Sequence, residues 1–261
     1  MEKIDLTAPA SWQELTQPQL DFLLRTISKI NRVNDGRPFL SQDDFAASTS
    51  AQVATLCLMR WNGLELVTPY GDNWMLRQGT REFIVSAADM AAACRALEWT
   101  RKLPQLPVRL DTIDGAQAVD AELDDSFSFD SWLACESLWQ VYQQSFDNEC
   151  LRRMAEILYD KRSIFLRDHE ALSVFYWWAG LKNLCNARYP NFFRPAPQGT
   201  ATEQPGPDRI RRDIDSQIRA LTKGDITKEK EVLAMPAHRA LTELDALARE
   251  YEELNRKYPS K

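Results

Sequence analysis

Few residues of the chain suit nucleophilic or metal-binding chemistry, and its two histidines come first among them. His169 and Glu170 begin like the zinc-binding pattern H-E-x-x-H, but Ser173 stands where the second histidine ligand is required. His238 follows Pro236 at the start of a predicted helix. Both histidines are therefore predicted to be surface residues near helix starts. A Cys–His pair formed by residues distant in sequence stays open as an alternative.

The cysteines are expected to be reduced and packed like small apolar side chains. Their number is odd, and no two of them have C-x-x-C spacing, so the sequence supports neither a zinc ribbon nor a thioredoxin-like redox site. The five are Cys57, Cys94, Cys135, Cys150 and Cys185.

An acidic segment is the best candidate for metal binding or acid–base work, because its carboxylates lie close together in sequence. Its members are Asp120, Glu122, Asp124, Asp125 and Asp130. Their spacing differs from that of an EF-hand loop, which requires a turn glycine and a terminal glutamate at set positions. A solvated loop that leads into a helix cap at Asp130 explains the segment better. No catalytic, metal-binding or cofactor-binding residue is assigned, and no cofactor is predicted.

Two apolar patterns are better candidates for function than these polar groups. The first is the block from Phe175 to Trp178, in which four adjacent aromatic residues point around most of a helix. They cannot all face one core. A central helix buried on all sides is the favoured interpretation, and exposure of Trp177 or Trp178 to a partner is the alternative.

The second pattern lies near the C-terminus and has the rhythm of a coiled-coil seam. Leu241, Leu244, Ala248, Tyr251 and Tyr258 follow spacings of three, four, three and seven, with Asn255 as a polar interruption. Such a helix can dock on its own body, pair with a second copy or bind another protein's helix. The predicted partner-binding residues are Leu241, Leu244, Leu247, Tyr251, Leu254, Trp177 and Trp178.

A basic and aromatic segment, residues 188–194, suits either single-stranded nucleic acid or a helix end that folds back onto the core. The net charge of the chain is −6, which opposes a general affinity for phosphates, so nucleic-acid binding is disfavoured.

Around these residues the sequence predicts an α+β fold that is predominantly α-helical. A helical body spans residues 1–193, with a small antiparallel β-meander near residues 64–85 where short runs of β-formers alternate with glycine turns. A Pro/Gly-rich linker follows over 194–208, and a helical tail over 209–261. Capping patterns at Ser11, Thr16 and Ser41 predict the first helix starts.

Composition agrees with a folded protein and excludes several classes. In 261 residues, 44% are hydrophobic and 27% charged, close to ordinary globular usage. No apolar run reaches the length of a membrane helix, and the N-terminus lacks the apolar core of a signal peptide, so a soluble, cytoplasmic protein is expected. The sequence contains neither a P-loop, nor a dinucleotide-binding glycine pattern, nor a G-x-S-x-G nucleophile motif.

Three blocks of sequence resemble a family of uncharacterised proteins encoded in bacterial prophage-like clusters. They are residues 10–16 (ASWQELT), 175–182 (FYWWAGLK) and 217–229 (QIRALTKGDITKE). The helical tail is similar in style to phage tail-assembly accessory proteins, which chaperone the long helical tape-measure protein. The resemblance implies a non-enzymatic tail-assembly or virion-assembly role and a helical tail protein as partner.

Two other functions remain open from the residues themselves. One is an enzyme of unfamiliar type that uses the acidic segment or a spatial Cys–His pair. The other is a regulatory nucleic-acid binder that uses residues 188–194 together with Arg209, Arg211 and Arg212. Pairing of two copies of the chain is also compatible with the C-terminal seam.

Overall fold

The computed structural model describes residues 6–33, 44–122, 125–194 and 206–258, and of residues 31–33, 44–49 and 207 it describes the backbone alone. The chain forms two compact units. The first comprises Met1–Pro104, Val108–Leu110 and Arg167–Tyr176, and the second comprises Gln105–Pro107, Asp111–Leu166 and Trp177–Lys261. The predicted boundary near residue 193 does not separate these units, because the tail belongs to the second unit together with much of the predicted body. Most of the predicted linker lies outside the described residues.

In the first unit, a capping box fixes the start of the first long helix, α1 (Gln17–Val33). Thr16 Oγ1 accepts the Gln19 N–H at 3.4 Å, and Gln19 Oε1 accepts the Thr16 N–H at 3.0 Å. Ser11 stands at the N-cap of η1 (Trp12–Glu14) as predicted, but its side chain makes no capping bond, and Ser41 lies outside the described residues. The helical elements that follow are α2 (Asp44–Trp61), α3 (Ala87–Cys94) and η2 (Arg95–Arg101).

The predicted β-meander is present. Strands β1 (Leu64–Tyr70), β2 (Asn73–Gln78) and β3 (Arg81–Ser86) pair antiparallel in that order, with a register shift in β1 between Leu66 and Thr68. Gly71 and Gly79 have φ angles of +59° and +60°, which the tight turns require. One face of the sheet packs Leu64 and Leu76 against Met90 of α3, so α3 covers the meander.

The second unit is helical apart from a two-stranded hairpin, β4 (Thr112–Ile113) and β5 (Ala116–Gln117). Its first long helix is capped by Ser128, whose Oγ accepts the Ser131 N–H at 3.1 Å, so the predicted cap at Asp130 is wrong. Lys223 and Gly224 end α7 in the left-handed conformation. The helices are α4 (Phe129–Ser145), α5 (Asn148–Leu158), α7 (Pro207–Thr222), η3 (Ile226–Lys228), α8 (Glu229–Ala234) and α9 (Ala237–Lys257).

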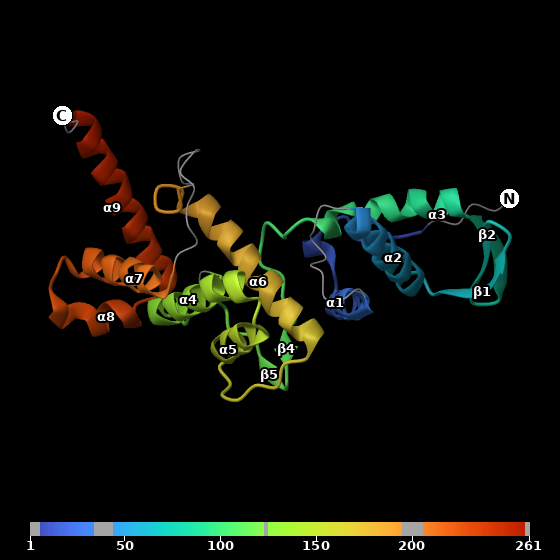
Figure 1. The fold of residues 1–261 in the computed structure, drawn as a ribbon, viewed down its shortest axis with the longest axis horizontal. Coiled ribbons are helices and arrows are strands. Elements are labelled where there is room, and N and C mark those ends of the chain that lie inside the picture. Colours follow the sequence, from blue (N-terminus) through green and yellow to red (C-terminus); the bar gives the residue numbers. More distant parts are fainter. Residues whose placement is uncertain (1–5, 34–43, 123–124, 195–205, 259–261) are drawn as a thin grey trace. The chain divides into compact units, whose positions relative to one another are not determined.

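Helix α6 (Asp168–Arg188) contributes to both units. Its residues up to Tyr176 belong to the first unit, and those from Trp177 onwards belong to the second. The structure therefore confirms a predominantly helical α+β fold with a small antiparallel sheet (Figure 1). Among the described residues, none of the helices is both long and apolar enough to cross a membrane.

Candidate protein-binding surface

The predicted partner-binding residues fall into two groups with opposite exposure. Trp177 and Trp178 are 0% exposed, and Leu241 and Leu244 are 1% and 4% exposed. The other residues lie further along α9: Leu247 is half-buried, whereas Tyr251 and Leu254 are 67% and 56% exposed. Only this second group offers apolar surface to another molecule.

The two tryptophans of α6 pack inside the second unit. The ring of Trp177 meets that of Tyr159 edge-on at 5.6 Å, and its Nε1–H donates to Glu122 Oε1 at 3.2 Å. The ring of Trp178 lies 5.0 Å from that of Trp132. The alternative that Trp177 or Trp178 faces a partner is therefore wrong. The favoured interpretation, a helix buried around its circumference, holds for this block.

Helix α9 is fixed at its base to the start of α4. The Phe129 N–H donates to the carbonyl of Met235 at 2.8 Å, and the Ala237 N–H donates to the carbonyl of Phe127 at 2.8 Å. Two further contacts of the base are apolar, since Leu241 and Leu244 lie in the core. The chain itself covers these two leucines, so they offer no exposed surface of the kind predicted for partner binding.

A turn after α6 braces the middle of α9. Asp245 Oδ1 accepts the N–H groups of Asn191 and Phe192 at 2.7 and 3.0 Å, and Asp245 Oδ2 accepts Asn191 Nδ2–H at 2.9 Å. Burial alone raises the pKa of the Asp245 carboxyl, but these hydrogen bonds outweigh burial and hold that pKa below its usual value. Arg194 forms an ion pair with Glu252, which lies two turns of α9 beyond Asp245.

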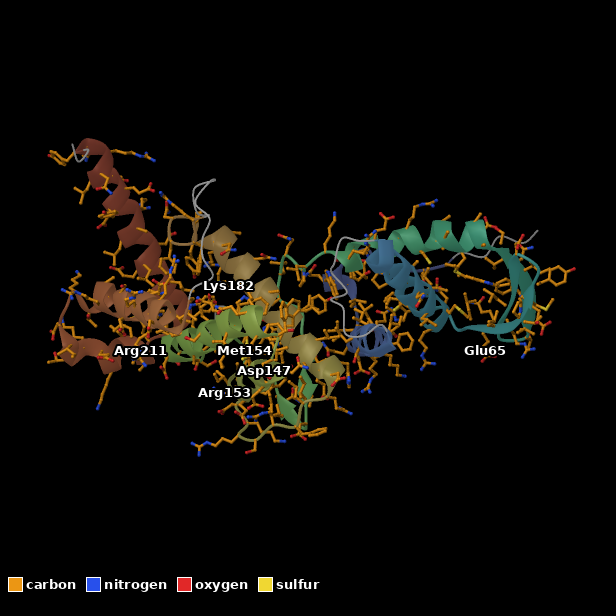
Figure 2. All side chains as sticks on the ribbon, viewed as in Figure 1. Glu65, Asp147, Arg153, Met154, Lys182 and Arg211 are labelled. Carbon is orange, nitrogen blue, oxygen red and sulfur yellow. The ribbon has the colours of Figure 1, made fainter. Side chains whose placement is uncertain are left out.

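The basic and aromatic segment, residues 188–194, contains this turn and packs against the core of the second unit. The ring of Phe193 lies 6.2 Å from that of Trp132, and the Lys182 ammonium lies 4.9 Å from the Phe193 centroid. Lys182, labelled on α6 in Figure 2, also pairs with Glu136 Oε1 of α4 at 2.8 Å. The segment thus folds back onto the core, which is the structural alternative of the two that its composition allows.

Beyond this brace, α9 carries an apolar stripe that the described chain covers only in part at Leu247 and leaves exposed further along the helix. We call Leu247, Tyr251, Leu254 and Tyr258 the distal stripe. Their spacings of four, three and four place them on one side of the helix over three turns. Tyr258 is 76% exposed. In Figure 1, α9 begins beside α7 and α8, and its C-terminal half extends away from them.

Asp245 is the residue of this region that sequence reasoning missed. It lies among the polar residues of an amphipathic helix, so nothing in its local sequence separates it from a solvated carboxylate. Only the position of the distant 191–192 backbone reveals its role.

The prediction that His169 lies on the surface is wrong, because this residue is buried. Its Nε2 lies 3.5 Å from Asp21 Oδ1 of α1. Burial, together with the guanidinium of Arg25, lowers the pKa of His169, so its imidazole is neutral at pH 7. Ser173, one turn later, is fully buried and accepts the Leu110 N–H at 2.8 Å. These polar groups serve packing and offer no access to a substrate.

The carboxylates of the acidic segment do not form one cluster, because Glu122 and Asp125 contact different parts of the chain. Glu122 accepts from Trp177, as above, and Asp125 pairs with Arg239 at 3.1 Å and lies 3.4 Å from His238 Nε2. His238 itself is half-buried, and Asp124 lies outside the described residues. Across residues 6–33, 44–122, 125–194 and 206–258, no group of three or more His, Cys, Asp or Glu side chains is placed to hold a metal ion.

All five cysteines are free thiols. Burial raises the pKa of Cys57 and of Cys185 to about 12, and it raises that of Cys135 as well. A thiol with such a pKa carries almost no thiolate at neutral pH, and the thiolate is the nucleophilic form. These three cysteines therefore pack as small apolar side chains.

No family model, no curated protein and no solved structure matches the chain.

Proposed function

We propose that the chain is a non-enzymatic protein-binding factor whose distal stripe packs against an apolar helix face of another polypeptide. The observation that carries the proposal is the exposure of Tyr251 and Leu254 on α9 and of Tyr258 at the C-cap of the same helix. Single exposed apolar residues are ordinary on protein surfaces, but a contiguous row at coiled-coil spacing is typical of a helix-pairing surface.

The energetic argument concerns what an unpaired stripe costs. Burying a large apolar side chain contributes about 1.5–3 kcal/mol. Side chains of this size gain that energy only if a partner removes them from water, and the described part of the chain leaves Tyr251, Leu254 and Tyr258 of the distal stripe exposed. The base of α9, by contrast, is already held by Leu241, Leu244 and the Asp245 brace. A fixed base presents the stripe as a preorganised surface.

The concrete form of the proposal follows the resemblance to prophage-encoded proteins. In that form the chain is a tail-assembly or virion-assembly accessory protein, and its partner is a helical tail protein such as the tape-measure protein. An amphipathic helix that awaits assembly needs its apolar face covered, and a matching stripe can cover it.

Site-specific photocrosslinking tests the proposal in the full-length protein. A benzophenone amino acid is placed at Leu254, and in a matched variant at Glu253, which is also exposed but points away from the stripe. We expect a discrete protein adduct from position 254 that is lost when Tyr251 and Tyr258 are changed to Ser.

Equal adduct yields from positions 253 and 254 would contradict a specific surface. Mass spectrometry of the adduct tests the concrete form, because a helical tail protein supports it and a partner without such a helix overturns it.

A further inference from the structure

We infer that the distal stripe pairs with the distal stripe of a second copy of this chain, with the two helices antiparallel. This inference rests on the general form of the proposed function, in which the distal stripe binds another polypeptide, and it names a second copy in place of the helical tail protein. It is argued from the charges that flank the stripe.

Two residues of opposite charge lie on the same edge of the distal stripe. Glu250 and Lys257 are seven residues apart, so two helical turns place one above the other. Both are exposed, and neither forms an ion pair with another described residue. The opposite edge of the stripe is uncharged, with Ala248 and Asn255 at the corresponding positions.

An antiparallel pair brings these charges together. When two identical helices pair antiparallel, the same edge of each stripe faces its copy with the order of residues reversed. Aligning Tyr251 with Leu254 of the second copy, and Leu247 with Tyr258, then sets Glu250 opposite Lys257 twice. A single register therefore pairs the apolar side chains of the two stripes with each other and also pairs each Glu250 with a Lys257.

A parallel pair lacks this complementarity. In parallel helices the charged edge of one copy faces the uncharged edge of the other, so Glu250 lies opposite Asn255 and Lys257 has no acidic partner. The flanking charges therefore specify orientation.

The size of the stripe sets the strength expected of the pair. Two copies contribute four tyrosines and four leucines, which bury on the order of 1,000 Å² in total, at the lower limit of specific interfaces. The pair is therefore expected to be a weak, reversible dimer whose population depends on protein concentration.

Sedimentation velocity of the full chain over a hundredfold range of concentration tests the inference. Glu250→Lys and Lys257→Glu each replace two attractive pairs by two repulsive ones, and each should weaken dimerisation about tenfold or more. Mixing the two variants should restore a dimer, because every flanking pair is then of opposite charge. The double variant should likewise regain wild-type association. Glu253→Lys makes the same charge change outside the stripe and should have no effect.

Each outcome decides between the two proposals. A wild-type chain that stays monomeric at all concentrations, or a double variant and a mixture that both fail to associate, overturns self-pairing. If the residue-254 crosslink then captures a different helical protein, the proposed function stands without it. If neither a dimer nor a stripe-specific crosslink forms, both proposals fall. Circular dichroism of each variant verifies that α9 remains folded.

Discussion

Helices α6 and α9 have the same length, 21 residues each, yet they treat their apolar side chains in opposite ways. In α6, Tyr176, Trp177 and Trp178 are buried on successive positions around the helix. In α9, apolar residues keep to one side, and this side is buried only in its first half. The difference shows that aromatic content alone does not identify an interaction surface. Exposure depends on two things: how the aromatic residues are arranged around the helix, and how far along the helix the neighbouring segments extend to cover it.

The largest effect should come from removing one aromatic ring from each helix. Trp178→Ala leaves a cavity beside Trp132 and should lower the free energy of unfolding by about 3–5 kcal/mol. Tyr251→Ala removes a ring that is mostly in water and should cost less than about 0.5 kcal/mol at low protein concentration. Urea unfolding followed by far-UV circular dichroism measures both. Similar losses for the two variants would erase the contrast between the helices.

A second test concerns the close packing of α6 at Gly180. A Cβ built on Gly180 would lie against the Leu106 carbonyl, 2.7 Å from the Leu106 carbonyl carbon and 2.9 Å from Pro107 Cα. Because these are backbone atoms, Gly180→Ala should destabilise the protein by about 1–3 kcal/mol despite the better helix propensity of alanine. Asn186→Ala, at an exposed position of the same helix, is the matched control and should be nearly neutral. A stabilising Gly180→Ala would show that α6 is packed less closely than described.

The brace on α9 gives a smaller effect. Asp245→Ala removes three hydrogen bonds to the 191–192 turn and should cost about 1–2 kcal/mol, because the carboxylate is partly solvated. The folded-state pKa of Asp245 is lowered, so its contribution is present above the unfolded value near 4 and is lost as the pH falls through the folded value. The pH dependence of urea unfolding between about pH 5 and 2.5 should therefore be shallower in the variant. Glu253→Ala is the exposed control, and an equal change there would remove the special role of Asp245.

The smallest effect concerns the start of α6, where burial holds His169 neutral. Its folded-state pKa is lowered, so the unfolded chain binds more protons below about pH 6.5 and stability falls as the pH decreases through that range. Thermal melts at about pH 7.5 and 5.5 should show a smaller decrease in Tm for His169→Gln than for the wild type. Parallel decreases in the two proteins would mean that His169 is not desolvated in the folded state.

Local sequence was sufficient where the structure depends on neighbours in the chain. The meander was predictable because β-formers and turn glycines lie within a few residues of one another, and Thr16 caps its own helix. Ser11 holds its predicted N-cap position without the expected side-chain bond, and the cap predicted at Asp130 is formed instead by Ser128, two residues earlier. Burial of His169 depends on α1, about 150 residues earlier in the chain, so its own neighbours gave no signal.

The candidate surface was predictable in its pattern but not in its extent. The heptad spacing of α9 includes Tyr251 and Tyr258 of the distal stripe, but it leaves Leu247 and Leu254 beside the seam. Which of its leucines are covered depends on where the start of α4 and the 191–194 turn end along the helix, and these segments are distant in sequence. Leu244 and Tyr251 occupy equivalent positions seven residues apart in the pattern, yet they are 4% and 67% exposed, so tertiary packing alone separates them.

The division of α6 between two units has a consequence for synthesis. The first unit contains the Leu110–Ser173 hydrogen bond and the contact between Trp12 and Tyr176, whose ring centroids are 4.8 Å apart. Trp12 also contacts Trp99 and donates to the Lys102 carbonyl, so a ribosome must deliver residue 102 before the indole acquires these neighbours and residue 176 before its surroundings are complete. Fragments that stop after the meander should emerge with that indole unprotected, and they would be prone to capture by chaperones or to aggregation.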